Sequence, residues 1–283
     1  MGPRAKACFG LTVFLACLCT NAITFAGELI RLESAPVHLG ELQKRLARER
    51  GERPKAASET IEGYLSKPEG DGPFAAIVYL HGCDELSEDA RKYNARGYVS
   101  LVLDSFSTRG IKNTCSQATP GLLFARQGDA LGALSYLSNL PFVDSQRIAV
   151  VGYSQGGVVA LQLASNHQAE IFDVPRGLKF KATVAYYPFC GVASEELIVP
   201  TLILIGELDD WTPARDCELW MKRRADRGAP VKLVVYPGAY HAFDFPAFAN
   251  GREYFGHWLK YDPSAAAQSV QEMRGFLAAQ FSR

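Results

Sequence analysis

The sequence has no excess of charge of either sign, because 30 Lys and Arg side chains balance 30 Asp and Glu side chains in 283 residues. A balanced chain offers no broad positive surface for nucleic acid or for an anionic membrane. Internal repeats and low-complexity tracts are also lacking, which argues against a repeat array. Beyond residue 26 no apolar run is long enough to span a bilayer. What is left is a chain long enough for one large domain with a sizeable core.

The one long apolar run lies near the amino terminus, over residues 9–19, and follows the basic residues Arg4 and Lys6. It is short for a transmembrane helix and has the length of the apolar part of a secretory signal. The segment at 24–26, Thr-Phe-Ala, places small residues where a signal peptidase reads. We therefore expect residues 1–26 to be a signal peptide, and the mature protein to be periplasmic or secreted without stable membrane insertion. The alternative is a short anchor that stays attached.

Cysteine is scarce in the chain beyond residue 26. Four of the seven cysteines lie there: Cys83, Cys115, Cys190 and Cys217. An even number in an exported chain predicts two disulfides. Three connectivities are open, and we favour Cys83–Cys115 with Cys190–Cys217 because each pair would join consecutive loops at one end of the sheet. The alternative is a set of buried free thiols.

Turn-forming residues separate apolar segments at regular intervals along the chain, which predicts alternating strands and helices. The expected strands are Leu29–Leu32, Thr60–Leu65, Ala75–Leu80, Tyr98–Leu103, Ile148–Val151, Ala182–Tyr187, Thr201–Ile205 and Leu233–Tyr236. The expected long helices are 86–96, 120–140 and 264–281, with another after Ser154. This alternation predicts an α/β fold with a mostly parallel sheet covered on both faces. We expect residues 27–58 to be an amino-terminal extension and 59–283 to be one domain.

The most informative stretch joins the strand Ile148–Val151 to the helix that starts near Gln155. Between them lies Gly-Tyr-Ser-Gln-Gly at 152–156, an instance of the G-x-S-x-G pattern. In such a turn the central residue is strained, and the flanking glycines remove side chains that would clash. The pattern predicts that Ser154 is a nucleophile exposed at the end of the sheet. The alternative is a glycine-rich turn whose serine only caps the helix.

A serine nucleophile needs a base and an acid that orients the base. Asp209 follows the strand Thr201–Ile205, and His241 follows the strand Leu233–Tyr236. The order Ser154, Asp, His is the one expected of α/β-hydrolases. Alternatively, the aspartate caps the next helix and the histidine is an ordinary loop residue. The competing histidines do not follow a late strand: His38, His81, His167 and His257.

Acyl transfer also needs N–H donors for the charge that develops on the carbonyl oxygen. Gln155 N–H, directly after the nucleophile, is one predicted donor. The second is expected in the loop after the strand Ala75–Leu80, where Gly82 allows a turn and Cys83 N–H is our choice. An ordinary strand-to-helix turn is the alternative for this loop.

Together these motifs resemble the dienelactone hydrolase family of α/β-hydrolases. The resemblance runs from about residue 59 to the end and is carried by Leu80-His81-Gly82, the Gly-Tyr-Ser-Gln-Gly-Gly at 152–157, Gly206-Glu207-Leu208-Asp209 with Thr212-Pro213, and the segment 236–243. It implies a sheet of seven or eight strands and hydrolysis without a metal or organic cofactor. It also favours Asp209 over its neighbours Glu207 and Asp210.

Two departures from the family bear on the substrate. The namesake enzymes have a cysteine where this chain has Ser154, and their glutamate partner to the thiolate has no clear counterpart here, since Glu85 matches poorly. In the family, arginines can hold a substrate carboxylate, and Arg109 follows a strand where it could do so. A surface arginine is the alternative. Tyr153, beside the nucleophile, is the second candidate for substrate binding.

The sequence thus predicts a serine hydrolase that cleaves a small ester or lactone through an acyl-enzyme. A peptidase or thioesterase on the same fold is the first alternative, and a non-catalytic envelope binding protein is the second. The aromatic residues between 243 and 261 either wall an acyl pocket or cover the edge of the sheet. The oligomeric state is not predicted.

Overall fold

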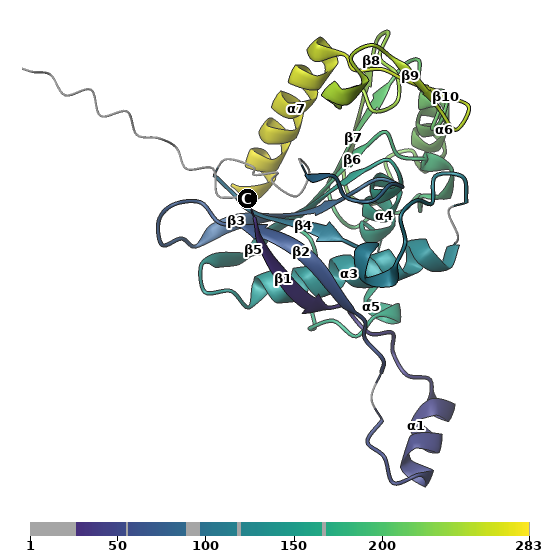
Figure 1. Cartoon of the computed structure of the whole chain (residues 1–283). Helices are drawn as coiled ribbons and strands as arrows, with labels where there is room; N and C mark the ends of the chain where they lie inside the picture. Colours follow the sequence, from purple (N-terminus) through teal and green to yellow (C-terminus); the bar gives the residue numbers. More distant parts are fainter. Residues whose placement is uncertain (1–26, 55, 89–96, 118–119, 166–167, 283) are drawn as a thin grey trace, which may run out of the picture.

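The computed structural model describes residues 27–54, 56–88, 97–117, 120–165 and 168–282 (Figure 1). The predicted signal peptide and His167 lie outside this part of the chain, as does most of the helix expected at 86–96. Within the described residues, no helix combines the length and apolarity needed to cross a membrane.

An eight-stranded sheet forms the centre of the molecule, in the order β1-β2-β4-β3-β5-β6-β7-β8. Its strands are β1 Glu28–Glu33, β2 Thr60–Ser66, β3 Phe74–Leu80, β4 Val99–Asp104, β5 Val143–Tyr153, β6 Ala182–Tyr186, β7 Thr201–Gly206 and β8 Val231–Tyr236. The pairs β1–β2 and β2–β4 are antiparallel, and the remaining pairs are parallel. The mostly parallel sheet predicted from the sequence is therefore confirmed.

Helices cover both faces of this sheet (Figure 1). They are α1 Glu41–Glu49, α3 Pro120–Ser138, α4 Gln155–Leu163, α5 Gln168–Ile171, α6 Ala214–Arg224 and α7 Pro263–Phe281. Alternate residues of β3 face opposite ways: Val78 packs in one core cluster with Leu134 of α3, and Ile77 packs in the other with Met273 of α7. Inner strands such as β7 have no exposed residue, because parallel strands between two helical layers are buried on both faces.

The amino-terminal segment divides into two parts. β1 pairs along its whole length with β2 and is the edge strand of the sheet. The expected boundary at residue 59 therefore leaves one sheet strand on the side of the extension. The following segment carries α1, which projects from the body of the molecule (Figure 1).

Near the carboxyl end, the chain adds a small two-stranded sheet that the sequence did not predict. β9 Arg252–Tyr254 and β10 His257–Leu259 form this antiparallel hairpin. Leu259 also bridges to His241 in the loop after β8. The hairpin thus lies beside the carboxyl ends of the parallel strands, where the candidate site is found.

Candidate active site

The turn between β5 and α4 holds Ser154 in a strained backbone conformation. Its φ of 50° and ψ of −115° lie in a region that L-residues rarely adopt. A Cβ on Gly152 would come within 2.0 Å of the Gly156 carbonyl oxygen, and one on Gly156 would come within 2.3 Å of the Leu80 carbonyl oxygen. Only glycine fits at these two positions, so the pattern in the sequence is a steric requirement of the turn.

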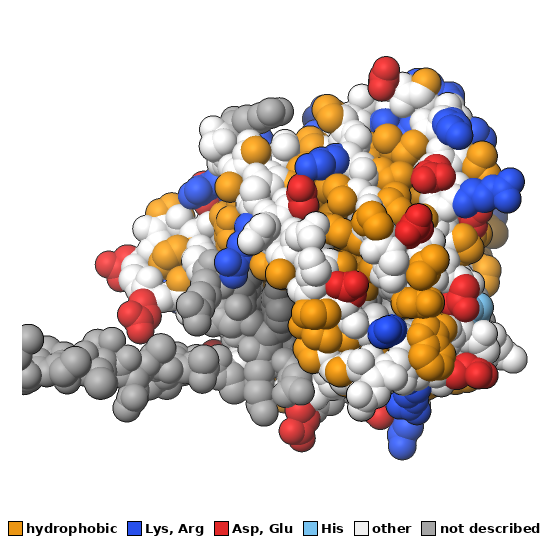
Figure 2. Space-filling model, turned by 90° about the horizontal axis from the view of Figure 1, so that it is seen from above, with side chains coloured by type: hydrophobic (Ala, Val, Ile, Leu, Met, Phe, Trp, Pro, Cys, Tyr) orange, Lys and Arg blue, Asp and Glu red, His pale blue; other side chains and the backbone are white. Residues whose placement is uncertain are grey.

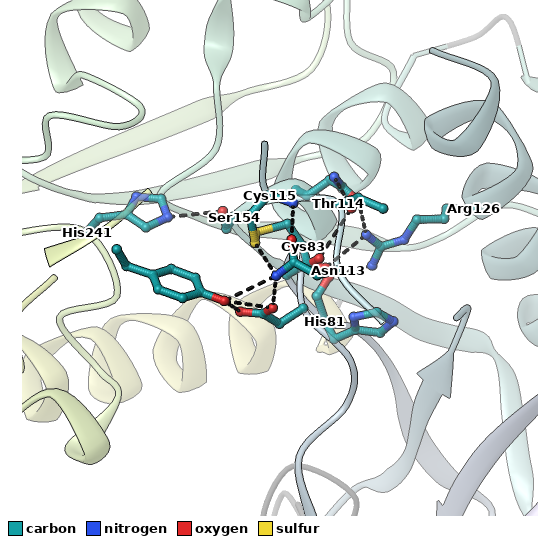
Figure 3. Close-up of a disulfide and its surroundings, with 12 residues drawn as sticks. His81, Cys83, Asn113, Thr114, Cys115, Arg126, Ser154 and His241 are labelled. Atoms are coloured by element: carbon teal, nitrogen blue, oxygen red, sulfur yellow. Dashed lines mark hydrogen bonds between the residues drawn. A yellow bond between two sulfur atoms is a disulfide. The ribbon is translucent and has the colours of Figure 1, made fainter. Parts of the chain in front are cut away.

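His241 brings a ring nitrogen to this serine. Its Nε2 lies 3.0 Å from Ser154 Oγ, and its Nδ1 lies 2.7 Å from Asp209 Oδ2 (Figure 3 shows the serine contact). The imidazole is 3% exposed and the aspartate side chain is fully buried. Three side chains that are far apart in the sequence therefore form one continuous hydrogen-bonded chain at the carboxyl ends of β5, β7 and β8.

The aspartate is held by further donors. Asp209 Oδ1 accepts the N–H groups of Trp211 at 3.0 Å and Thr212 at 2.8 Å. Thr212 Oγ lies 3.0 Å from Asp209 Oδ2 and 3.0 Å from the carbonyl oxygen of Tyr187. The carboxylate thus holds the turn before α6 and contacts the imidazole. It does not cap the helix, as the alternative reading of the sequence had it, because the N-cap residue is Pro213 and no side chain caps α6. Thr212 was not among the residues that we expected in the site.

The neighbouring acids have other partners. Glu207 accepts the N–H of Gly238 at 2.9 Å, and Asp210 accepts the N–H of Trp258 in the hairpin at 3.3 Å. Neither of these bonds involves His241. The spacing that singled out Asp209 in the sequence therefore matches the carboxylate that the structure brings to the imidazole.

One competing histidine, His81, directly follows β3. It is buried, and its Nε2 accepts the Ser105 N–H at 3.4 Å. Burial, reinforced by the positive charge of Arg126, lowers its pKa to about 3. A ring that remains neutral and buried in this way is a packing group, with its edge against Phe106.

The loop after β3 lies against the nucleophile. A Cβ on Gly82 would stand 3.7 Å from Ser154 Cβ. The next residue, Cys83, forms a disulfide with Cys115, and its carbonyl oxygen accepts the Thr114 N–H at 2.8 Å (Figure 3). The loop proposed to supply a second N–H donor is thus tied to the segment after β4.

The second disulfide joins Cys190 of η2 (Cys190–Val192) to Cys217 of α6, and both residues are fully buried. The structure therefore forms both of the pairs that we favoured from the sequence. Disulfides of this kind are typical of proteins that work outside the reducing cytoplasm.

Arg109 differs from its expected role. Its guanidinium donates to Asp129 Oδ2 and Oδ1 at 2.7 and 2.8 Å, to the Ser105 carbonyl oxygen at 2.7 Å, and to Glu59. Asp129 is fully buried, so the pair is an internal ion pair between η1 (Ser107–Arg109) and α3. Arg109 is therefore neither a free anchor for a substrate carboxylate nor an isolated surface arginine, because the buried Asp129 binds it.

Aromatic rings surround the imidazole. Tyr187 lies 4.6 Å from the ring of His241, and Trp211 lies 5.2 Å from it. Trp211 also contacts the hairpin, with its ring 4.8 Å from His257 and 6.2 Å from Tyr254. The aromatic segment 243–261 therefore has two roles, because Phe243 is fully buried in the core while the hairpin aromatics lie beside Trp211.

Tyr153, the other candidate for substrate binding, is half-buried at the end of β5. Its ring stacks on Tyr186 at 4.8 Å and lies 6.3 Å from Tyr187.

Within the described residues, no group of three or more His, Cys, Asp and Glu side chains is arranged to hold a metal ion.

Comparison with known proteins adds several relatives. The chain is 32% identical over 109 residues to the esterase FrsA of Shigella boydii, a match that covers 37% of this chain and 25% of FrsA. The matched region is thus about a quarter of the length of that relative.

Among solved structures, a dienelactone hydrolase of Klebsiella pneumoniae superposes with a TM-score of 0.58 at 19% identity, over 89% of this chain and 99% of that one. The apo form of esterase 2 from Thermogutta terrifontis gives 0.57 at 19% identity, over 78% and 90% of the two chains. These likenesses establish the α/β-hydrolase fold.

The profile of the dienelactone hydrolase family matches residues 61–281. This range contains all of β2 but its first residue, the strands β3 to β8, the strained serine turn and the loops that carry Asp209 and His241. The chain belongs to the dienelactone hydrolase family.

Proposed function

We propose that this protein is a serine hydrolase that cleaves carboxylic ester or lactone bonds through an acyl-enzyme. The observation that carries the proposal is the hydrogen-bonded chain from Ser154 through His241 to Asp209, with contacts of 3.0 and 2.7 Å. Family membership, and the esterase activity named for FrsA and for the Thermogutta protein, favour esters over other acyl compounds.

In the first half of the reaction, Ser154 Oγ attacks the substrate carbonyl carbon while its proton passes to His241 Nε2. Asp209 stays ionised, fixes the ring and stabilises the imidazolium. The carbonyl π electrons move to oxygen, where the N–H groups of Gln155 and Cys83 stabilise the charge. The tetrahedral intermediate collapses, the C–O bond to the alcohol breaks, and the imidazolium protonates the leaving oxygen.

The second half releases the acyl group. A water molecule gives a proton to His241 Nε2 and adds to the acyl carbon, and the same two N–H groups stabilise the oxyanion again. Collapse breaks the bond to Ser154 Oγ, which takes the proton back. In a lactone, the alcohol and acid products are parts of one hydroxy acid.

The setting of the enzyme is also a proposal. We propose that residues 1–26 direct export, that 59–283 form the hydrolase domain, and that the mature protein acts in the periplasm or medium. Two disulfides favour such a compartment.

Steady-state turnover tests the proposed activity. A panel of p-nitrophenyl esters and a lactone should be hydrolysed, and Ser154→Ala should abolish turnover while melting at the same temperature as wild type. Aminoacyl anilides and thioesters should react more slowly. Preference for anilides would favour a peptidase, and preference for thioesters a thioesterase. No turnover of any class by folded wild type would favour the binding protein.

A further inference from the structure

Arg126 of α3 is a buried cation that the proposed mechanism does not use. Its side chain is fully buried, and burial lowers its pKa to about 10. Its hydrogen-bond acceptors are the carbonyl oxygen of Gly82 at 3.1 Å, the carbonyl oxygen of His81, and Gln155 Oε1 at 2.6 Å. The negative charges of Asp129 and Asp104 partly offset the cost of burying this cation, but its hydrogen bonds go to neutral acceptors beside the nucleophile. Burial of a cation in this way is costly, so the arrangement calls for a function beyond packing.

Those acceptors belong to the loop that faces the nucleophile. In a trans peptide the C=O of one residue and the N–H of the next point in opposite directions. The C=O of Gly82 and the N–H of Cys83 share one peptide plane, so the guanidinium that binds the former also sets the direction of the latter. On the far side of Cys83, its own carbonyl oxygen accepts the Thr114 N–H at 2.8 Å. Three consecutive carbonyls, from His81 to Cys83, are therefore each fixed by a donor.

The same guanidinium reaches the residue that supplies the other proposed donor. Gln155 Oε1 accepts from Arg126 Nη1, and its Nε2 donates to Thr114 Oγ at 3.0 Å. One network thus links Arg126, Thr114 and the side chain of Gln155 to the backbone of residues 81–83. Figure 3 shows these groups on the side of the serine opposite His241.

We propose that Arg126 is a positioning residue that orients the two N–H groups of the oxyanion hole, by binding the backbone of the 81–83 loop and the side chain of Gln155. This inference rests on the proposed function. Because Arg126 is fully buried, it acts through these residues and does not touch the substrate. Its positive charge, placed behind both donors, adds to the potential that favours an oxyanion.

Arg224 provides a matched control. It is also buried, and among the residues that the structure describes its guanidinium donates only to backbone carbonyls, those of Ala225, Arg227 and Ala229. It lies at the end of α6 and has no contact with the 81–83 loop among its hydrogen bonds. Replacing either arginine removes a buried cation from a set of carbonyls, but only one set belongs to the proposed oxyanion hole.

The experiment compares Arg126→Lys, Arg126→Met and Thr114→Val with Arg224→Met. Melting temperature, kcat and KM for a p-nitrophenyl ester are measured together with the hemiketal that Ser154 forms with an aryl trifluoromethyl ketone. In that adduct Ser154 Oγ bonds to the ketone carbon and its proton passes to His241. The 19F shift against pH reports the pKa of the hemiketal oxygen, which rises when the oxyanion hole weakens.

Arg126→Met should lower kcat by up to about 10²-fold, the loss seen when one oxyanion donor is removed, because both donors would be loosened although neither is removed. KM should change less than about threefold. Arg126→Lys should fall between this variant and wild type, because lysine retains the charge without the fork. Thr114→Val, which keeps the backbone N–H, should show a smaller loss in the same direction. All three should raise the pKa of the hemiketal, whereas Arg224→Met should lower only the melting temperature.

An unchanged hemiketal pKa in folded Arg126→Lys and Thr114→Val would overturn the inference while leaving an active wild type and the proposed function intact. If Arg126→Met does not fold, those two variants decide the question. A wild type that neither turns over esters nor binds the ketone would overturn the proposed function, and the inference with it.

Discussion

The backbone of Ser154 is strained, and its surroundings hold it in the conformation that directs its hydroxyl to His241. Its strained backbone is supported by an N–H bond to the Tyr186 carbonyl oxygen at 3.0 Å and by the helix that starts beside it. Strain of this kind persists only where the surrounding structure over-determines it, and here the glycines at 152 and 156 admit no side chain. The hydroxyl is consequently directed to the imidazole rather than into the helix.

Replacement of Asp209 by Asn tests the role of the orienting acid. The amide would preserve the shape but favour the wrong tautomer of His241 and lose the negative charge. We expect kcat to fall by about 10⁴-fold, as for the corresponding change in a serine protease, with little change in melting temperature. Steady-state kinetics of Asp209→Asn and Asp210→Asn provide the comparison. Equal activity of the two variants would mean that the acid beside the imidazole has no special role.

At this scale the sequence supplied the order of the three side chains and the spacing that separates Asp209 from its neighbours. It did not reveal the contacts of Thr212 and Arg126, because Thr212 binds the carbonyl oxygen of Tyr187 and Arg126 binds those of His81 and Gly82, which are remote in sequence. The pair Arg126 and Asp129, charged residues within an otherwise apolar helix, is a signal that could have drawn attention to α3. Arg109 was misassigned because its buried partner was not visible as such.

Among the structural elements, the loops after β3 and β4 behave as one unit. The Glu85 N–H donates to the Lys112 carbonyl oxygen at 2.8 Å, and Asp84 bridges to Asn113. Tyr254 of the hairpin donates to Asp84 at 2.7 Å, which connects this unit to the aromatic groups near His241. The first disulfide closes the unit next to the proposed N–H donor.

The two disulfides should therefore differ in their effect. Replacing Cys83 and Cys115 together by serine should lower kcat, by less than the roughly 10²-fold that loss of a donor causes, because the donor is loosened and not removed. Replacing Cys190 and Cys217 should instead lower stability by about 2–5 kcal/mol and leave kcat near that of wild type. Thermal melts and steady-state kinetics on both double variants distinguish them. Full kcat in the first variant would contradict this assignment.

The strands and long helices could be predicted because each repeats one burial pattern over many residues. β3, β6 and β7 are continuous apolar runs, and the structure buries them as expected. The β9–β10 hairpin could not be predicted, since its strands have three residues each and gain stability from contacts such as Trp211 with His257. Short elements of this kind depend on tertiary contacts that the local sequence does not encode.

At the scale of the whole molecule, the balanced composition can be followed on one face of the surface. Figure 2 shows acidic, basic and apolar side chains interspersed over the face seen from above, without a field of one sign. A chain with a net charge of 0 gives little long-range electrostatic steering toward a highly charged partner. Recognition of substrate is therefore expected from the aromatic groups around His241.

One half-buried acid should affect the pH dependence of stability. Asp244 accepts a hydrogen bond from Tyr187 at 2.8 Å, and burial raises its pKa from 3.8 to about 6. Between these values the folded state binds more protons than the unfolded state, so this carboxyl makes the fold less stable as the pH rises through the window.

Thermal melts between pH 4 and 7 check this expectation, because this range runs from near the ordinary pKa of the carboxyl, 3.8, to above its raised pKa of about 6 in the folded state. The melting temperature of Asp244→Asn relative to wild type should rise as the pH increases from 4 to 6, since the amide has no proton to lose. A variant of the exposed Asp71, Asp71→Asn, is the control and should follow the wild-type curve. Parallel curves for all three proteins would contradict the role given to Asp244.

The central claim is that Ser154 becomes a nucleophile because His241 and Asp209 are joined to it. The most direct measurement is intact-protein and peptide mass spectrometry after treatment with a fluorophosphonate, which reacts with activated serines. The account predicts one label, on Ser154, in the wild type, and a much slower reaction in folded His241→Ala. A folded wild type that remains unlabelled, or that is labelled elsewhere, would contradict it.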